Sequence, residues 1–187
     1  MIYTSGSTGT PKGVVMPHAA IVDYVTGILA ALTLPSPSRF GMVSTVAADL
    51  GHTQLFGALS SGGSLILADE DTAFNPVALA AFMSRSGVDV LKLTPSHLRG
   101  LLDACASADL LPRHTLILGG EAVSGELVRR VRDLMPDLHI VNHYGPTETA
   151  VGAAYQRVPE VLDQTATIPL GQPLPNRHLY VLDEHRQ

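Results

Sequence analysis

The sequence alternates between short apolar runs and longer segments with helical spacing along most of its 187 residues. Residues 18–32, HAAIVDYVTGILAAL, carry apolar residues at helical spacing, and residues 40–47, FGMVSTVA, are typical of a short buried strand. The alternation continues through TQLFGALSSGG, SLILA, NPVALAAFMSRSG, VDVLKLTP, SHLRGLLDAC, HTLILGGE, SGELVRRVRDLM and LHIVNHYG. This pattern predicts an α/β fold in which helices flank a mostly parallel sheet.

Local signals place some of the boundaries and the expected site. Asn75, Pro76 and Gly87 are a cap, a first helical residue and a terminator for one helix. The acidic run DED at 69–71 is expected to be a solvated turn. Ligands of such sheets bind beyond the carboxyl ends of the strands. The expected site is therefore built from the strand-end segments VAADLGHT, LKLTPSH, ILGGEA and VNHYGPTET.

Residues 3–14, YTSGSTGTPKGV, have the composition of a phosphate-binding loop. Glycines let the backbone approach a ligand, bare N–H groups form an anion-binding concavity, and a lysine supplies a point charge. The common nucleotide P-loop requires Gly-Lys-Ser/Thr, whereas Lys12 lies between Pro11 and Gly13. The alternative is a Gly/Ser-rich surface loop without a ligand.

Composition excludes several classes of protein. A formal net charge of −5 argues against a nucleic-acid partner. The single cysteine, Cys105, excludes an internal disulfide framework and is expected to be a small core residue. No apolar run approaches the ~20 residues of a membrane span, and Met1 leads directly into the loop. A cytoplasmic protein without a membrane partner is expected.

A second motif, NHYGPTE at 142–148, gives the first loop its context. Together with YTSGSTGTPKG, LILGGEAV and IPLGQPLPNRHLYVLD, in this order, it resembles the adenylate-forming superfamily, specifically the adenylation domains of nonribosomal peptide synthetases. The resemblance covers residues 1–187 and implies part of the large N-terminal subdomain. Upstream strands, the ribose-binding aspartate, and the C-terminal subdomain with its catalytic lysine are missing, so the isolated chain is expected to be inactive.

The resemblance implies a two-step reaction that uses ATP and Mg²⁺. An amino acid carboxylate attacks the α-phosphate of ATP, and the acyl group then passes to the phosphopantetheine thiol of a carrier domain. Carrier and condensation domains of a parent synthetase are the expected partners. The residues implied to hold the β- and γ-phosphates are Thr4, Ser5, Gly6, Ser7, Thr8, Gly9 and Lys12.

The same resemblance assigns the remaining nucleotide contacts. Thr147 is implied to contact the α-phosphate and Glu148 to bind Mg²⁺, which favours carboxylate oxygen; with Lys12 they form the implied catalytic set. Tyr144 is implied to stack on adenine, with Gly119, Gly120 and Glu121 lining the base. The alternatives are a simple turn for YGPTE and a helix-capping role for Glu121.

The amino acid pocket is also assigned by resemblance. Asp49 matches the carboxylate that pairs with a substrate α-ammonium group, and its alternative is a helix cap. This match argues against ligases that activate fatty or aryl acids. The implied specificity residues are Asp49, Leu50, Thr53, Lys92, Ile117, Gly119, His143, Val151 and Gly152.

Two basic residues determine the expected substrate. Lys92 interrupts an apolar strand, where an unpaired ammonium is unfavourable, unless its side chain snorkels to the surface. His143 alone is typical of a core histidine. Together they are expected to provide one certain and one titratable positive charge in a small pocket, as in the family's signature for aspartate.

Asparagine is the alternative substrate, and in the family an acidic residue at the position of His143 accompanies it. Neutral asparagine would leave Lys92 without a counter-charge, while the extra methylene of glutamate is rejected by only ~1–3 kcal/mol. A non-catalytic nucleotide-binding module is a further alternative, against which Lys12 and Glu148 argue.

Overall fold

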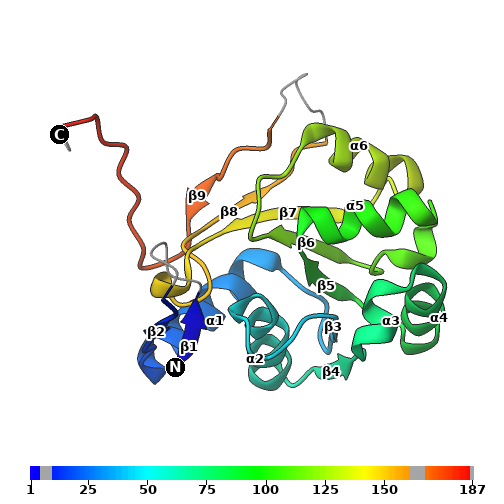
Figure 1. Cartoon of the computed structure of the whole chain (residues 1–187), viewed down its shortest axis with the longest axis horizontal. Coiled ribbons are helices and arrows are strands. Elements are labelled where there is room, and N and C mark those ends of the chain that lie inside the picture. The colour runs from blue at the N-terminus through cyan, green and yellow to red at the C-terminus, as the bar shows by residue number, and fades with distance from the viewer. Residues whose placement is uncertain (5–9, 161–166, 186–187) are drawn as a thin grey trace.

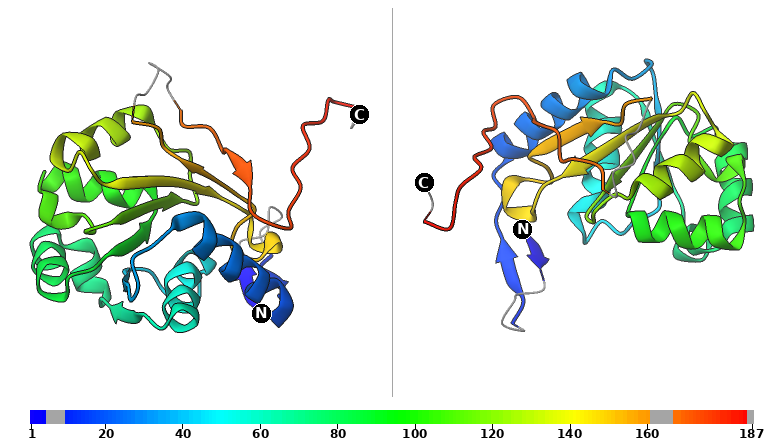
Figure 2. Two further views of the ribbon diagram at one scale, coloured as in Figure 1. Left: turned by 180° about the vertical axis from the view of Figure 1, so that it is seen from behind. Right: turned by 90° about the horizontal axis from the view of Figure 1, so that it is seen from above.

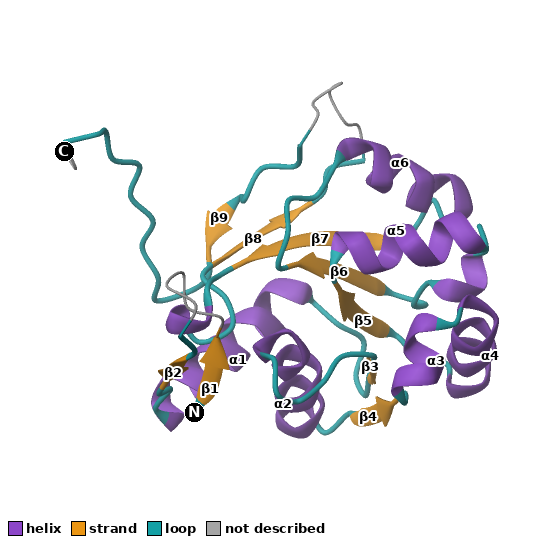
Figure 3. Ribbon diagram, viewed as in Figure 1, coloured by secondary structure: helices purple, strands orange, loops and turns teal. Residues whose placement is uncertain are grey.

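The structure, a computed structural model, describes residues 1–4, 10–160 and 167–185 (Figures 1 and 3). Helices and strands alternate along most of the chain, as the sequence pattern predicts. The elements are β1 (Ile2–Thr4), β2 (Lys12–Val14), α1 (His18–Leu32), β3 (Arg39–Met42), η1 (Asp49–Gly51), α2 (His52–Ser61), β4 (Ser64–Leu67), α3 (Glu70–Phe74), α4 (Pro76–Ser86), β5 (Val90–Leu93), α5 (Pro95–Ala104), η2 (Ala108–Leu110), β6 (Thr115–Gly119), α6 (Gly125–Leu134), β7 (His139–Tyr144), η3 (Thr147–Thr149), β8 (Ala154–Arg157) and β9 (Gln172–Pro173).

The described residues form a seven-stranded sheet in the order β4-β3-β5-β6-β7-β8-β9. The five strands from β4 to β7 in this order are parallel to their neighbours, whereas β8 and β9 are antiparallel and extend one edge. Helical crossovers between parallel strands cover both faces of such a sheet. The predicted fold, a mostly parallel sheet flanked by helices, is confirmed.

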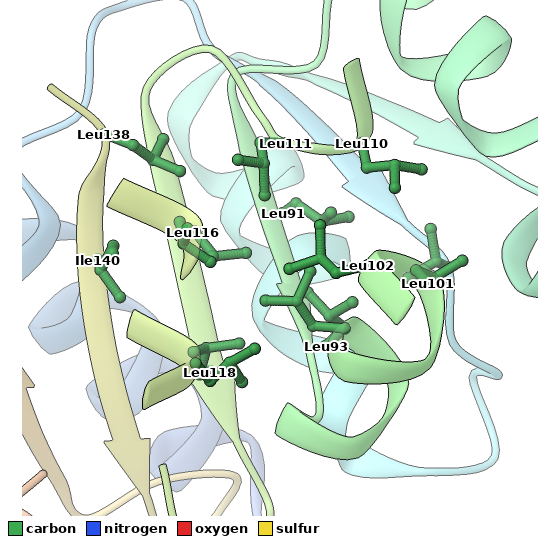
Figure 4. Packing of buried hydrophobic residues seen from close by; sticks show 14 of the residues in the cluster. Leu91, Leu93, Leu101, Leu102, Leu110, Leu111, Leu116, Leu118, Leu138 and Ile140 are labelled. Atoms are coloured by element: carbon green, nitrogen blue, oxygen red, sulfur yellow. The ribbon is translucent and has the colours of Figure 1, made fainter. Parts of the chain in front are cut away.

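The sheet separates two apolar clusters (Figure 2). On one face, α4, α5 and α6 pack a leucine-rich cluster against β5, β6 and β7, shown in Figure 4. On the other face, α1 and α2 pack a smaller cluster against the same strands. The partly buried Cys105 packs against the larger cluster, as expected of a small core residue.

Capping residues act as the sequence predicts at α4 but not at α3. Asn75 accepts hydrogen bonds from the N–H groups of the first turn of α4, and Gly87 ends that helix at φ 59°. The acidic run at 69–71, expected as a turn, instead begins α3. Asp69 caps this helix by accepting from Thr72 N, and the next two acidic residues lie in its first turn. Carboxylates stabilise a helix N-terminus through its unpaired N–H groups and dipole, which explains the difference.

Strand β3 ends at Met42, five residues before the end predicted from FGMVSTVA. Thr45 ends the extended backbone, because its hydroxyl accepts from Ala47 N and its carbonyl from Ala48 N. Such local hydrogen bonds compete with strand pairing. The resulting turn leads into η1 and places Asp49 near the carboxyl end of the sheet.

The first two strands form a separate antiparallel hairpin, with Thr4 opposite Lys12. The three views in Figures 1 and 2 agree in placing this hairpin beside the η3 turn that follows β7. None of the helices in the described ranges is long and apolar enough to cross a membrane.

Candidate functional site

Three neighbouring strands direct residues of the expected pocket to the face covered by α1 and α2. Side chains alternate between the faces of a strand, so residues two apart share a face. Val90, Ile117 and Val141 belong to the cluster on the α1–α2 face. Two positions further along, at the carboxyl ends of the same strands, are Lys92, Gly119 and His143, with Gly119 opposite His143 in the strand register.

Lys92 lies at one end of a buried hydrogen-bonded chain. Its side chain is only 2% exposed, so the snorkelling alternative is wrong. Nζ of Lys92 donates to Oγ1 of Thr53, in the first turn of α2, over 2.8 Å. The hydroxyl of Tyr24 lies 2.6 Å from that same oxygen and 3.1 Å from Nε2 of His143. A lysine, a threonine, a tyrosine and a histidine from four elements are therefore connected.

The charges of this chain differ from those expected. Burial lowers the pKa of Lys92 to about 7, an effect that the charge of Asp49 opposes. Burial and the charge of Lys92 lower the pKa of His143 well below its usual value. The expectation of one certain and one titratable cation is therefore corrected. Lys92 is the group that titrates near neutral pH and His143 is neutral there, because among the described residues neither forms an ion pair that would offset its desolvation.

Asp49 presents a carboxylate oxygen without a partner. It is the first residue of η1, and its Oδ2 is buried without a hydrogen-bond partner in the described ranges. Asp49 is not the cap of α2, whose N-cap is Gly51 and has no side-chain cap hydrogen bond. A buried, unpaired carboxylate is unfavourable unless a cation or donor completes it. Asp49 can therefore accept an ammonium group.

Two glycines let the basic residues pack closely against the backbone. A Cβ on Gly119 would lie 2.9 Å from the carbonyl oxygen of His143, 3.4 Å from Cε of Lys92 and 3.5 Å from Nδ1 of His143, so both side chains lie next to this glycine. A Cβ on Gly152 would lie only 2.2 Å from Nε2 of His143 and 2.9 Å from Cε2 of Tyr24. The residue at 152 must therefore be glycine for the histidine and the tyrosine to meet.

The other predicted pocket residues take different places. Ile117 and Val151 are buried in the cluster on the α1–α2 face. Leu50 is half-buried and lines an adjoining cavity of about 890 Å³ together with Thr94 and Phe74. The structure thus brings Thr53, Lys92, Gly119, His143 and Gly152 together, with Asp49 in electrostatic range of Lys92.

Three of the four predicted adenine residues line a second cavity, of about 440 Å³, at the ends of β6 and β7, and Gly119 is not among its lining residues. Gly120, Glu121 and Tyr144 contribute to its walls, and the ring of Tyr144 is 44% exposed. Gly120 has φ 83°, a conformation that favours glycine. An accessible aromatic ring opposite glycine-containing backbone fits a flat heteroaromatic base.

Glu121 has a structural role, which was the alternative interpretation of this residue. Its carboxylate accepts from the backbone N and from Oγ of Ser96, at 3.0 and 2.6 Å, in the first turn of α5. A carboxylate at this position satisfies an N–H group of the helix end. Because both carboxylate oxygens accept these hydrogen bonds, this side chain links the strand-end loop to α5.

The predicted phosphate and metal residues lie in two segments. Lys12 is exposed on β2, and Thr4 pairs with it across the hairpin. Thr147 and the exposed Glu148 lie in η3, beside the hairpin. Ser5, Gly6, Ser7, Thr8 and Gly9 lie outside the described residues. The described ranges contain no group of three or more metal-ligating side chains. A single carboxylate still fits Mg²⁺, which is usually held by one or two carboxylates together with phosphate oxygens and water.

Sequence reasoning missed Tyr24 and Ser96. Tyr24 lies on the buried face of α1 with Val25 and Ile28, where it looked like one more apolar residue of the helical pattern. The available signal was its hydroxyl, because a fully buried tyrosine usually needs a hydrogen-bond partner. Ser96 gave no such signal, since a serine in the first turn of a helix usually bonds only within that helix.

The fold places two cavities at the carboxyl ends of the strands of an α/β sheet, and the comparisons give the family. The family model of AMP-binding enzymes matches residues 1–187. The chain therefore belongs to the AMP-binding enzyme family. This agrees with the resemblance carried by the sequence motifs.

Curated relatives are peptide synthetases of much greater length. The chain is 35% identical over 187 residues to tyrocidine synthase 3 of Brevibacillus parabrevis and 37% identical over 190 residues to bacitracin synthase 3 of Bacillus licheniformis. These alignments cover 100% and 99% of the chain, and the chain spans 3% of the length of each relative.

Solved structures share the fold. PA1221, an NRPS protein containing adenylation and PCP domains, is 30% identical with a TM-score of 0.87, and the match covers 100% of this chain and 37% of that one. AB3403, a four-domain nonribosomal peptide synthetase bound to AMP and glycine, is 28% identical with a TM-score of 0.82, covering 100% of this chain and 13% of that one.

Proposed function

We propose that this chain is the part of a nonribosomal peptide synthetase adenylation domain that binds L-aspartate and activates it as aspartyl-AMP. In this reaction an oxygen of the α-carboxylate bonds to the α-phosphorus of ATP, and pyrophosphate leaves. The aspartyl group then passes to the thiol of a phosphopantetheine carrier. The observation that carries the proposal is the buried Lys92, which lies next to Gly119 together with His143 and is within electrostatic range of Asp49, whose Oδ2 is buried without a partner among the described residues.

Two opposite charges can orient the substrate. The free oxygen of Asp49 is suited to the α-ammonium group, and Nζ of Lys92 retains two donors after its bond to Thr53. A side-chain carboxylate beside Gly119 would restore the charged form of Lys92, because an opposite charge raises the pKa of an ammonium group. Charge-assisted hydrogen bonds of this kind are stronger than neutral ones.

The same geometry discriminates between similar amino acids. Asparagine has nearly the shape of aspartate but carries no charge to offset the buried ammonium of Lys92. Leaving a buried charge unpaired costs about 2–5 kcal/mol. Glutamate adds one methylene, which pocket size alone disfavours by ~1–3 kcal/mol. Aspartate is therefore the preferred substrate, with asparagine as the nearest competitor.

The nucleotide site supplies the electrostatic part of the reaction. Mg²⁺ and ATP, when bound, provide the activated phosphoryl group and its charge compensation. Tyr144 and Gly120 would hold the base, Thr147 the α-phosphate and Glu148 the metal ion. Lys12, Thr4 and the residues at 5–9 would bind the β- and γ-phosphates, which stabilises the leaving pyrophosphate.

PA1221, a relative of known structure with adenylation and PCP domains, supports a carrier domain as a partner, and we propose a condensation domain and a cytoplasmic setting with it. An acyl- or aryl-acid ligase would have no ammonium group for Asp49, and its carboxylate would remain buried without a partner. A non-catalytic nucleotide-binding module would have no use for the exposed Lys12 of β2 and the exposed Glu148 of η3.

The test is amino-acid-dependent ATP–pyrophosphate exchange by the full-length protein that contains this chain, over all twenty amino acids. Aspartate is expected to give the highest kcat/KM. His143→Glu is the matched variant, because a carboxylate there would pair with Lys92 and repel the substrate carboxylate. It is expected to shift the aspartate/asparagine ratio toward asparagine by about 10–100-fold.

Other substrate profiles would refute parts of the proposal. A wild-type preference for asparagine would keep the reaction but reject our interpretation of His143. Activity only with a fatty or aryl acid would reject amino acid activation. The isolated 187 residues are expected to be inactive, and aspartate-dependent exchange by them alone would contradict the assignment of a partial domain.

A further inference from the structure

We propose that Tyr24, on helix α1, is a further specificity-determining residue of the amino acid pocket, which acts by fixing the hydrogen-bonding direction of His143 toward the substrate side chain. This inference rests on the proposed function, because it concerns the choice between a carboxylate and an amide side chain at that site.

Tyr24 connects the two sides of the pocket. Its side chain is fully buried, and its hydroxyl lies between Oγ1 of Thr53, at 2.6 Å, and Nε2 of His143, at 3.1 Å. The rings of Tyr24 and His143 meet edge to face, with centroids 5.8 Å apart at 71°. Gly152 permits this contact, since a Cβ there would lie 2.9 Å from the tyrosine ring. The position of the hydroxyl is thus fixed by packing as well as by hydrogen bonds.

The hydrogen bonds between Thr53, Tyr24 and His143 can be donated in either of two directions. Each hydroxyl has one proton to donate, and a neutral imidazole has one donor nitrogen and one acceptor nitrogen. In the first direction, Thr53 donates to Tyr24, Tyr24 donates to Nε2 of His143, and Nδ1 of His143 carries the ring proton. In the second, Nε2 of His143 donates to Tyr24 and Tyr24 donates to Thr53, which leaves Nδ1 as an acceptor.

Lys92 selects the first direction. In its charged form, which a bound carboxylate favours, its Nζ can only donate to Thr53. Accepting a hydrogen bond from a cation makes the Thr53 hydroxyl a better donor, and chains of hydrogen bonds strengthen one another when they run the same way. Tyr24 is the link that carries this preference from Thr53 to His143.

The direction of these hydrogen bonds determines whether Nδ1 of His143 is a donor or an acceptor toward the substrate. Nδ1 of His143 lies next to Gly119 and the Lys92 side chain, and it has no hydrogen-bond partner within the described part of the chain. With the first direction, this nitrogen is an N–H donor close to the ammonium of Lys92, where the substrate side chain is proposed to bind. A carboxylate oxygen accepts from both groups, whereas the NH₂ group of an asparagine side chain would meet two donors. Tyr24 thereby adds to the preference for aspartate over asparagine.

The test compares Tyr24→Phe with the wild type in the full-length protein by amino-acid-dependent pyrophosphate exchange. The substitution keeps the ring and removes only the hydroxyl. We expect the kcat/KM ratio of aspartate to asparagine to fall about tenfold, mainly through a higher KM for aspartate with kcat largely retained. Tyr155→Phe is the control. The Tyr155 hydroxyl accepts a hydrogen bond from Gln172 and does not belong to the hydrogen-bonded chain from Lys92 to His143, so its loss should leave the ratio unchanged.

A second measurement does not depend on the substrate. In ¹⁵N NMR of the imidazole nitrogens, wild-type His143 should be protonated on Nδ1, and Tyr24→Phe should give a mixture of both tautomers. An unchanged aspartate/asparagine ratio in Tyr24→Phe, or a wild-type His143 protonated on Nε2, would overturn the inference. If the wild type prefers an amino acid other than these two, the proposed function fails. The tautomer of His143 then decides alone whether Tyr24 positions it.

Discussion

The two faces of the sheet are built from the same strands but are used for different purposes. On the face covered by α4–α6, Leu91 and Leu93 of β5 lie in an apolar cluster with Leu118 of β6. On the face covered by α1 and α2, β5 presents Val90 and then Lys92, which is bonded to polar side chains. The alternation of one strand thus separates an apolar face from a polar pocket.

The difference shows where this fold accepts unfavourable burial. Burying an apolar side chain of the size of leucine stabilises a protein by about 1.5–3 kcal/mol, whereas burying an ammonium without a carboxylate opposes folding. Lys92 has one hydroxyl partner and a pKa lowered to about 7. The apolar face therefore stabilises a structure in which the other face retains an incompletely paired charge, as the proposed substrate site requires.

Exchanging Lys92 for methionine should separate activity from stability most strongly. The change removes the charge but keeps a long, flexible side chain in the pocket. We expect aspartate-dependent exchange to lose about a thousandfold in kcat/KM, since the loss of one partner of a buried charge pair costs several kcal/mol. The free energy of unfolding should stay equal or increase, because the desolvated ammonium is gone. Exchange kinetics and denaturant unfolding of the same preparation would measure both.

Two outcomes would contradict this view of Lys92. Retention of aspartate activation would show that the ammonium does not contact the substrate. A large loss of stability would show that Lys92 supports the fold rather than the pocket. Leu59→Met, at an exposed position of α2, serves as a conservative comparison that should change neither kcat/KM nor the free energy of unfolding appreciably.

The opposite result is expected for Leu93, one position further along the strand. Its side chain is 1% exposed and packs in the cluster of the α4–α6 face. Leu93→Ala should lower the free energy of unfolding by about 3 kcal/mol, through lost apolar burial and a cavity. The aspartate/asparagine ratio of the remaining folded protein should be unchanged. A changed ratio would mean that the two faces are coupled, which would weaken the comparison between them.

Sequence patterns predicted the apolar face more fully than the polar one. Periodicity located the buried strands and helices, and the capping residues of α4 fixed its ends. The family motifs named Lys92, Thr53 and His143, and alternation along β5, β6 and β7 explains why they meet. The run at 69–71 was misread because an acidic cluster is equally typical of a turn and of a helix start.

The properties that were missed depend on three-dimensional surroundings. The lowered pKa of Lys92 follows from its complete desolvation and from the lack of an ion pair among the described residues. Neither can be inferred from an apolar strand sequence. Tyr24 meets His143 only because Gly152 leaves space between segments more than a hundred residues apart in sequence. The carboxylate of Glu121, after β6, accepts a hydrogen bond from Ser96 in α5. Long-range polar contacts of this kind have no local sequence signal.

The smallest expected effect concerns pH, and it tests the burial of Lys92 directly. The pKa of Lys92 is lowered from 10.5 to about 7 in the folded protein. Between these two values the unfolded chain binds a proton that the folded protein does not. Stability therefore rises with pH across this window, by up to 1.36 kcal/mol per pH unit for one group. Below pH 7 both states are protonated at Lys92, and this contribution to the pH dependence disappears.

We expect the free energy of unfolding of the wild type to rise by about 2 kcal/mol from pH 7.5 to pH 9.5, relative to that of Lys92→Met. Other groups titrate in both proteins, so the difference between the two curves isolates Lys92. Equal slopes would mean that the ammonium remains charged in the folded state. Lys92 would then have a stronger partner than Thr53, and the polar face would resemble the apolar one in being fully satisfied without a ligand.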